Sequence, residues 1–269
     1  MNTAIVRVAA GVMALALTGC TAEATTGSVA GAGELVIGVK ADQPGLGLRE
    51  GGEFRGFEVD VGTYIARHIG ASRVTFKAVT SADRDRRLNR HEVDLVLASY
   101  SITPARTRQV TFAGPYYLAH QDLMVRRTES RIRGARDMAG RRMCQASGSV
   151  STERVTVGLG VQARLVPAAS YGECVEKLRR GEIDVVSTGD LVLAGFAARH
   201  SELKIVNAPF TDEPYGVALR KGDIEGCEAV NRALTLMYQD GTAGRLLRKW
   251  FGRSGLRPVE SVPEFQGCS

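Results

Sequence analysis

The chain contains 269 residues, of which 44% are hydrophobic, 24% charged and 6% aromatic. These proportions are typical of a soluble globular protein, and they exclude collagen, a disordered chain and a multi-span membrane protein. The 35 Lys and Arg residues outnumber the 29 Asp and Glu residues and give a net charge of +6. The charges alternate along the chain and form no basic arm, so we expect no nucleic-acid partner. The length allows a large core divided between two lobes.

The N-terminal residues have the pattern of an export signal. Arg7 is followed by an apolar run from Val8 to Leu17, which is too short to span a bilayer. The ending Leu17-Thr18-Gly19-Cys20 resembles the lipobox of bacterial lipoproteins, in which the cysteine is lipidated and becomes the first mature residue. An ordinary secretory signal with a chance cysteine is the alternative. We predict a signal peptide over residues 1–20 and a lipid on Cys20 that anchors the protein to the outer face of the cell membrane.

The next segment, residues 21–33, contains mainly small and polar residues, so we expect a flexible tether there, with the folded part beginning near Glu34. Hydrophobic periodicity then predicts a strand at 35–39, a helix over 57–68, a strand at 74–79, a charged helix at 81–90 and a buried strand at 93–98. The glycines of residues 158–163 superficially match a dinucleotide-binding fingerprint. A strand predicted at 164–167 follows at once and leaves no room for the helix of that motif, so we interpret the glycines as a loop.

A pattern in the first half of the chain recurs 90 residues later. The repeated residues are Leu88, Arg90, Glu92, Asp94 and Val96, which correspond to Leu178, Arg180, Glu182, Asp184 and Val186. Thr80 and Ser170 each precede a charged helix and are suited to cap it. The two halves therefore predict similar strand, helix, strand units of a parallel sheet, whose ligands bind beyond the carboxyl ends of strands. Two lobes facing across a cleft would bring residues 98–101 and 187–190 together, and chance similarity is the alternative.

Apart from Cys20, the sequence has four cysteines: Cys144, Cys174, Cys227 and Cys268. Outside the cytoplasm an even number of cysteines favours disulfides. Three pairings are possible, and we predict Cys144 with Cys174 and Cys227 with Cys268 because these pairs close the shorter loops. A zinc site is disfavoured, because no two cysteines have C-x-x-C spacing and the four histidines are scattered.

The sequence contains no nucleophile elbow, P-loop, zinc-protease or EF-hand motif. Cationic and hydroxyl groups instead lie near the predicted strand ends, and such groups suit the binding of carboxylates. These residues are Lys40, Arg84, Ser99, Ser101, Arg106 and residues 147–149.

Four stretches are distinctive in sequence and order: residues 39–47 (VKADQPGLG), 56–61 (GFEVDV), 99–116 (SYSITP to FAGPY) and 214–217 (PYGV). They resemble solute-binding protein family 3, in particular the actinobacterial glutamate-binding lipoproteins of ABC importers. The resemblance implies an α/β, type II periplasmic-binding-protein-like fold, with two lobes that are each a mostly parallel sheet flanked by helices. It places lobe one at residues 34–124 and 218–269, lobe two at residues 125–217, and two hinge strands near 123–126 and 216–219. Closure of such lobes is a hinge motion that ligand contacts to both sides stabilise.

The resemblance also implies how a ligand carboxylate would be held. Arg106 corresponds to the residue that binds the ligand α-carboxylate, and a planar guanidinium suits a planar carboxylate. Ser99 and Ser101 would add hydroxyl and main-chain bonds. The loop Ser147-Gly148-Ser149 corresponds to a helix start whose N–H groups bind the same carboxylate. A solvated surface arginine and a plain serine turn are the alternatives.

Two further cations favour an acidic ligand side chain. Lys40 stands at a position that is commonly Asp in relatives with cationic or amide ligands, and it reverses that charge preference. Arg84 corresponds to an arginine of the glutamate-type members. The alternative for Arg84 is an exposed helix residue paired with Asp83 or Asp85.

One departure from the family pattern concerns the ligand amine. Relatives read Ser/Thr-Thr-Asp-Asp where this chain reads Ser187-Thr188-Gly189-Asp190, so the usual partner of the α-ammonium is missing at Gly189. An unpaired buried ammonium would be costly. Thr188 and Asp190 remain candidate ligand contacts, with Asp190 turned inward by a loop shift. The alternatives are that Glu213 serves, that Asp190 caps the following helix, or that the ligand is a dicarboxylate without an amine.

The function that the resemblance implies is capture of glutamate, or a related acidic or polar amino acid, for uptake by an ABC permease. A sensing protein that signals to a membrane partner is the second possibility. An enzyme is not expected, because no histidine lies near the strand ends to act as an acid or base. We expect a monomer without cofactor or metal.

Overall fold

The computed structural model describes residue 1, residues 27–254, residue 256 and residues 262–268. Its strands are β1 (Glu34–Val39), β2 (Asp42–Gln43), β3 (Gly47–Glu50), β4 (Glu53–Arg55), β5 (Arg73–Ala78), β6 (Leu95–Leu97), β7 (Val110–Arg126), β8 (Arg142–Ala146), β9 (Arg164–Ala168), β10 (Val186–Gly189), β11 (Leu203–Ile205) and β12 (Thr211–Arg220). Its helices are α1 (Phe57–His68), α2 (Arg84–Asn89), α3 (Pro104–Thr107), η1 (Ala135–Met138), α4 (Ser151–Glu153), η2 (Arg154–Gly158), α5 (Tyr171–Arg179), α6 (Asp190–Arg199), α7 (Ile224–Gln239) and α8 (Thr242–Phe251). The signal peptide and Cys20 lie outside the described residues.

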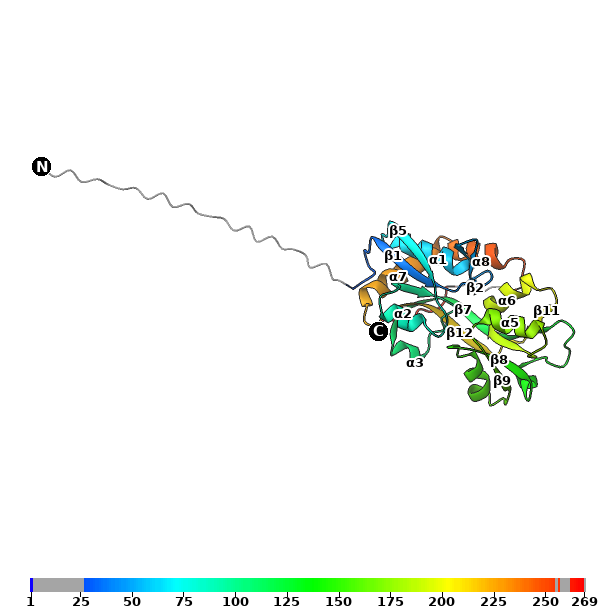
Figure 1. Cartoon of the computed structure of the whole chain (residues 1–269). Coiled ribbons are helices and arrows are strands. Elements are labelled where there is room, and N and C mark those ends of the chain that lie inside the picture. Colours follow the sequence, from blue (N-terminus) through cyan, green and yellow to red (C-terminus); the bar gives the residue numbers. More distant parts are fainter. Residues whose placement is uncertain (2–26, 255, 257–261, 269) are drawn as a thin grey trace.

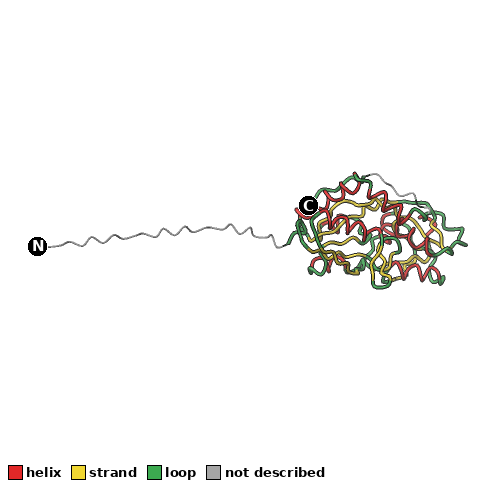
Figure 2. The backbone as a smooth tube through the Cα atoms, turned by 90° about the horizontal axis from the view of Figure 1, so that it is seen from above, coloured by secondary structure: helices red, strands yellow, loops and turns green. Residues whose placement is uncertain are grey.

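Two long strands cross the molecule and join its two halves (Figure 1). β7 and β12 pair with each other in antiparallel fashion, and the described strands around them follow the order β10-β7-β12-β6-β1-β5, with β11 on β7. β5 and β6 flank β1 in parallel, and β8 pairs with β9 in parallel in the other half. The large sheet is therefore parallel only at its β6-β1-β5 end, because the crossing strands run antiparallel to their neighbours, and β8 and β9 form a separate parallel pair. Figure 2 shows helices lying along both sides of these strands, and the predicted two-lobed α/β fold is confirmed.

The pairing of the crossing strands changes register in the middle of the molecule. Tyr215 lies opposite Tyr117, but Val217 lies opposite Ala113, with a β-bulge between them. Bulges bend a strand and interrupt its ladder. β7 already pairs with β10 from Gln121 onward. The bulge therefore indicates that β12 bends between Tyr215 and Val217. The lobe boundaries expected at residues 124 and 217 stay a prediction.

The repeat at 90 residues corresponds to a repeated set of hydrogen bonds. Asp94 accepts a bond from the N–H of Val36 at 2.8 Å, and Asp184 accepts one from the N–H of Arg142 at 2.9 Å. In return, the Asp94 N–H donates to the Val36 carbonyl, and the Asp184 N–H donates to the Arg142 carbonyl. Each aspartate thus attaches the start of its strand to the parallel strand beside it. The repeat is therefore a structural one, because the same residues make the same contacts in both halves.

Two expected element boundaries differ from the structure. The charged helix begins at Arg84 instead of Ser81, because Thr80 and Asp83 form a turn in which the Thr80 hydroxyl accepts from the Asp83 N–H at 3.2 Å. The expectation of a free tether is wrong for residues 27–33. Val29 is 2% exposed, and its N–H donates to Asp223 at 3.0 Å. Arg220 and Ser72 also donate to the carbonyls of Gly27 and Gly33, so several contacts attach this segment to the folded part.

Both predicted disulfides are present. Cys144 on β8 is bonded to Cys174 on α5, and Cys227 on α7 is bonded to Cys268 near the end of the chain. In the part of the chain that the structure describes, no helix is both long and apolar enough to cross a membrane.

Candidate functional site

A small cavity lies between the two halves, beside the bulge in β12. Its volume is about 20 Å³, which is close to the room that one water molecule needs and far below the roughly 300 Å³ of small-molecule pockets. Larger cavities of about 560 and 300 Å³ adjoin it and share lining residues with it. The small cavity is lined by Ser81, Arg84, Ser99, Ser101, Arg106, Ser149, Val150, Ser151, Tyr171, Thr188, Gly189, Glu213 and Tyr215.

Two buried guanidinium groups contact the same aromatic ring on one wall of the cavity. The Cζ atom of Arg84 lies 3.6 Å from the ring centre of Tyr100, and that of Arg106 lies 4.8 Å from it. Burial and the like charge of Arg84 lower the pKa of Arg106 to about 10, so the group stays charged at neutral pH. Within the described chain, Nε of Arg84 is buried without a hydrogen-bond partner. This wall is suited to an anion.

The local sequence explains the position of Arg106. Thr103 caps α3, accepting a bond from the Arg106 N–H at 3.3 Å, and Pro104 takes the first helical position, where its missing N–H costs nothing. The guanidinium then donates to the carbonyl of Ser101 at 2.9 Å and to the carbonyl of Gly148 at 3.2 Å. Because Gly148 belongs to the other half, Arg106 connects the two sides of the cleft.

Ser99 has a backbone conformation that is uncommon for a residue with a side chain. Its φ angle is 45°, in the left-handed region. The buried carboxylate of Glu58 holds it there, accepting the Ser99 N–H at 2.6 Å and the Tyr116 hydroxyl at 2.6 Å. Such strained residues persist where the surrounding structure holds them, often at functional sites. Ser99 follows the end of β6 and lines the cavity in this conformation.

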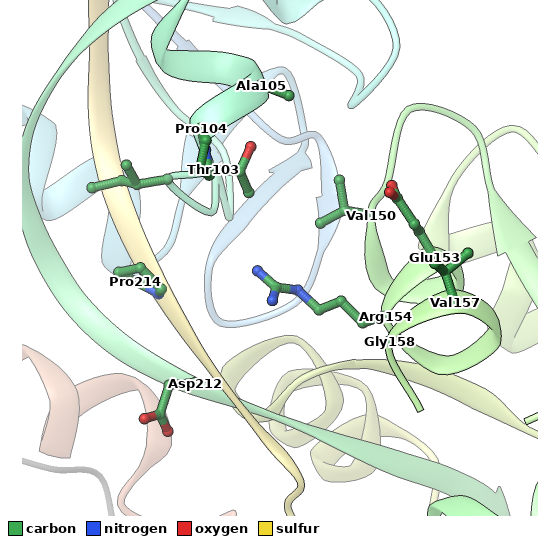
Figure 3. A pocket seen from close by; sticks show the side chains of 11 residues that line it. Thr103, Pro104, Ala105, Val150, Glu153, Arg154, Val157, Gly158, Asp212 and Pro214 are labelled. Atoms are coloured by element: carbon green, nitrogen blue, oxygen red, sulfur yellow. The ribbon is translucent and has the colours of Figure 1, made fainter. Parts of the chain in front are cut away.

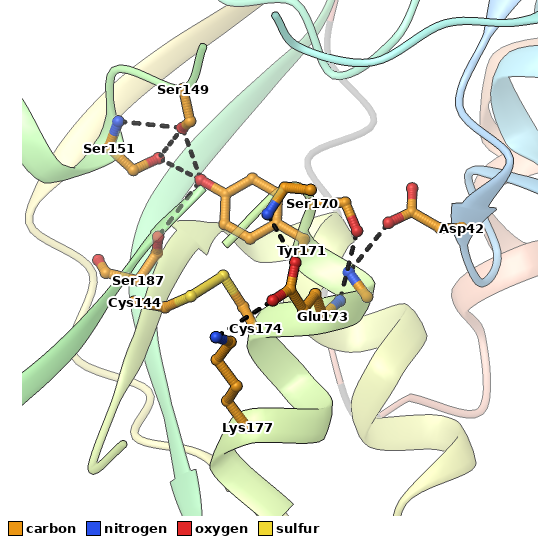
Figure 4. Close-up of a disulfide and its surroundings, with 12 residues drawn as sticks. Asp42, Cys144, Ser149, Ser151, Ser170, Tyr171, Glu173, Cys174, Lys177 and Ser187 are labelled. Atoms are coloured by element: carbon orange, nitrogen blue, oxygen red, sulfur yellow. Dashed lines mark hydrogen bonds and ion pairs between the residues drawn. A yellow bond between two sulfur atoms is a disulfide. The ribbon is translucent and has the colours of Figure 1, made fainter. Parts of the chain in front are cut away.

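Tyr171 organises the opposite wall (Figure 4). Its hydroxyl bonds with Ser149 at 2.6 Å and Ser151 at 2.9 Å, and Ser149 Oγ accepts the Ser151 N–H at 3.2 Å. Cys174 lies one turn along α5 from Tyr171, and Cys144 lies just before the serine loop. The disulfide therefore ties together the two segments that form this wall.

Six of the ten predicted ligand residues line the cavity together: Arg84, Ser99, Ser101, Arg106, Ser149 and Thr188. Ser147 is exposed, and its N–H donates to the Ala168 carbonyl. Gly148 contributes its carbonyl to Arg106 but does not line the cavity. Ser147 and Gly148 are therefore structural parts of the loop in this arrangement.

Lys40 lies behind the cavity wall. Its ammonium group donates to Ser81 at 2.7 Å and lines the adjoining 300 Å³ cavity. Burial, and next to it the charge of Arg84, lower the pKa of Lys40 to about 7. Lys40 thus reaches the site through Ser81 instead of facing it directly.

Asp190 is turned away from the cavity. Its carboxylate accepts the Leu191 N–H at 2.7 Å and the Tyr117 hydroxyl at 3.3 Å, at the start of α6. Burial raises the pKa of Asp190 to about 6. Asp190 therefore neither lines the cavity nor makes the N-cap hydrogen bond that the alternative interpretation expected.

A second chamber adjoins the cavity through an ion pair. Glu213 lines the small cavity and pairs with Nε of Arg154, which lines the chamber of about 560 Å³ (Figure 3). The sequence named Glu213 as an alternative amine partner. Arg154, Tyr171 and Ser151 were not predicted as site residues. For Tyr171, its position directly after the helix cap Ser170 was an available signal.

No cluster of residues among those described could hold a metal ion.

Two α/β halves joined by crossing strands, with a charged cavity between them, define a two-lobed ligand-binding protein. The sequence profile of the bacterial extracellular solute-binding proteins, family 3, matches residues 35–253. The chain therefore belongs to this family, and the resemblance seen in the sequence is confirmed.

Individual relatives agree with this assignment. The glutamate-binding protein GluB of Corynebacterium glutamicum is 37% identical over 246 residues, covering 86% of this chain and 83% of GluB. The ABC transporter glutamine-binding protein GlnH of Bacillus subtilis is 31% identical over 222 residues, or 81% of each chain. A solved ancestral arginine-binding protein bound to arginine is 31% identical, with a TM-score of 0.75 over 82% of this chain and 99% of that one. These relatives are binding proteins by name.

Proposed function

We propose that the protein captures glutamate, or a closely related acidic amino acid, outside the cytoplasm and delivers it to the permease of an ABC transporter. A lipid on Cys20 would hold it at the membrane, and it would act as a monomer. The observation that carries the proposal is the pair of buried guanidinium groups against Tyr100. Two like charges in a site with little water are stabilised by anionic partners.

An acidic amino acid has two carboxylates for these two arginines. Bidentate, charge-assisted bonds between guanidinium and carboxylate are among the strongest hydrogen bonds in proteins. Relatives are named for glutamate, glutamine and arginine, which supports an amino acid as the ligand. Among these amino acids, the two arginines favour an acidic one.

Calorimetric titration of the purified protein with the twenty common amino acids and with glutarate tests the proposal. We expect glutamate to bind most tightly. Arg106→Ala should lose about 2–5 kcal/mol of binding free energy, whereas the exposed neighbour Arg108→Ala should bind as the parent does. Absence of binding to any acidic amino acid, or unchanged binding by Arg106→Ala, would contradict the proposal.

A transport role and a sensing role differ in living cells. Cells that lack the protein should lose uptake of labelled glutamate at low concentration and regain it on complementation. Unchanged uptake would favour the sensing role.

A further inference from the structure

One buried carboxylate stands among the described residues that line the small cavity. Glu213 on β12 is 3% exposed. It pairs with Nε of Arg154, and its Oε1 accepts the Thr211 hydroxyl at 3.3 Å. Arg154 is more accessible, with 28% of its side chain exposed. The ion pair spans the wall between the small cavity and the 560 Å³ chamber, and Figure 3 shows the Arg154 side chain reaching toward β12 at Pro214.

Other carboxylates near the cleft do not line the small cavity: Glu58 accepts the Ser99 N–H and the Tyr116 hydroxyl, and Asp85 accepts the Tyr100 hydroxyl. Asp190 faces Tyr117 and the start of α6. Asp42 accepts the N–H of Gly172 at 3.0 Å, beside the cavity that Lys40 lines. A side chain at Gly189 is excluded, because the Tyr215 hydroxyl occupies the space of its Cβ. An ammonium enclosed with Arg84 and Arg106 therefore has Glu213 as its anionic partner.

We propose that Glu213 binds the α-ammonium of the ligand and that Arg154 is its exchangeable counter-ion, which withdraws into the larger chamber when the ammonium arrives. This inference rests on the proposed function. With this assignment the charges of site and ligand are complementary. The two guanidiniums and one carboxylate of the protein face the two carboxylates and one ammonium of an acidic amino acid. The site would thereby select α-amino acids over dicarboxylates that lack an amine.

The exchange avoids an isolated buried charge. Glu213 has Arg154 as its partner before the exchange and the ligand ammonium after it, and removing one member of a buried pair without replacement is strongly unfavourable. Arg154 has space to enter, because the chamber it lines is large and is also lined by the exposed carboxylate Glu153. Arg154 begins a π-helical segment, a rare form that is frequent at functional sites.

The first test compares glutamate with glutarate, which has the same two carboxylates and no amine. Glu213→Gln should weaken glutamate binding by about 30-fold or more and leave glutarate binding within about threefold. The matched control is Glu129→Gln, because Glu129 is also a shielded glutamate paired with an arginine, but it lies outside the cavity. Glutamate affinity within about threefold of the parent in Glu213→Gln would overturn the inference.

The second test removes the competing cation. Arg154→Met should bind glutamate more tightly than the parent, by about tenfold, because the ammonium no longer displaces an arginine. A loss of glutamate affinity in Arg154→Met as large as that in Glu213→Gln would overturn the exchange.

A third measurement observes the ion pair directly in the unaltered protein. The Nε–H resonance of Arg154, assigned by its absence from the spectrum of Arg154→Met, should shift on saturation with glutamate and not with glutarate. An unchanged resonance with bound glutamate would overturn the exchange. If the unaltered protein binds no amino acid at all, the proposed function fails and this inference fails with it, whereas binding without these effects contradicts the inference alone.

Discussion

The hydroxyl group of Tyr215 occupies the space that a Cβ atom on Gly189 would need. Gly189 ends β10, and Tyr215 lies at the bulge of β12, so this contact joins two strands at the cavity. The φ angle of Gly189 is −63°, which any residue can adopt. The glycine is therefore required by space and not by backbone conformation.

This contact predicts that Gly189→Ala is destabilising. Overpacking at a buried site typically costs about 1–3 kcal/mol, and the shift of Tyr215 should also weaken ligand binding. Gly189→Ala combined with Tyr215→Phe should recover part of the loss, because the nearest remaining tyrosine atom, Cζ, lies 3.0 Å from the new Cβ. Thermal unfolding and calorimetry measure both effects. Gly134→Ala is the control, because no atom lies within 4 Å of its Cβ position.

Asp190 is predicted to affect stability without affecting affinity. Burial raises its pKa to about 6 from the usual 3.8, so the folded state binds its proton more readily than the unfolded state. The stability of the unaltered protein should therefore fall as pH rises from about 4 through 6, and Asp190→Asn should lose this part of the decrease. Unfolding free energies at pH 4.5 and pH 7 test the sign. A large loss of glutamate affinity in Asp190→Asn would instead place Asp190 on the ligand.

Lys40 should make the stability of the protein rise with pH, which is the opposite of the effect of Asp190. Its pKa is lowered from 10.5 to about 7, mainly by burial, with Arg84 acting in the same direction and Asp42, Glu58 and Asp83 opposing it. The unfolded state then binds the proton more tightly, so stability rises with pH between about 7 and 10. Lys40→Met removes the cost of the buried charge, and its advantage over the parent protein should be largest below pH 7 and decline above it. An advantage that is constant across this range would show that Lys40 does not titrate as described.

The two disulfides should differ in their effect on binding. Each closes a loop, of 30 and 41 residues respectively, and chain-entropy arguments give each about 3–4 kcal/mol of stability. Replacing Cys144 and Cys174 by serine should lower both stability and affinity, because the bond holds the serine loop and Tyr171 together. Replacing Cys227 and Cys268 should lower stability alone. Equal affinities in the two double variants would contradict this role.

Cys20→Ser should release the protein from the membrane. The prediction follows from the ending Leu17-Thr18-Gly19-Cys20. Stable anchoring needs two hydrophobic chains or a second signal, which a lipidated cysteine with several acyl chains provides. Immunoblots of membrane and medium fractions measure the distribution. Continued membrane retention of the variant would show that the anchor lies elsewhere.

The sequence alone predicted the internal repeat and the two disulfide pairs from spacing, and the fold class from the α/β pattern together with the family resemblance. Asp94 and Asp184 make equivalent bonds because each follows the same helix turn within its own unit. Arg106 was predicted from the family resemblance, and the structure adds that Thr103 and Pro104 start the short helix that carries it. Local capping and hydrophobic periodicity act within a few residues, and a sequence shows them directly.

Only the tertiary structure decided which side chains share the cavity. Glu213 and Arg154 lie 59 positions apart in the sequence (213 − 154) and meet because β12 returns across the molecule beside η2. Lys40 was expected in the site but lies one side chain behind it, since Ser81 takes the intervening place. Asp190 points away because its neighbours Tyr117 and Leu191 satisfy its carboxylate. The partner of each buried polar group depends on which side chains the fold brings close to it. Spacing along the chain does not give these distances.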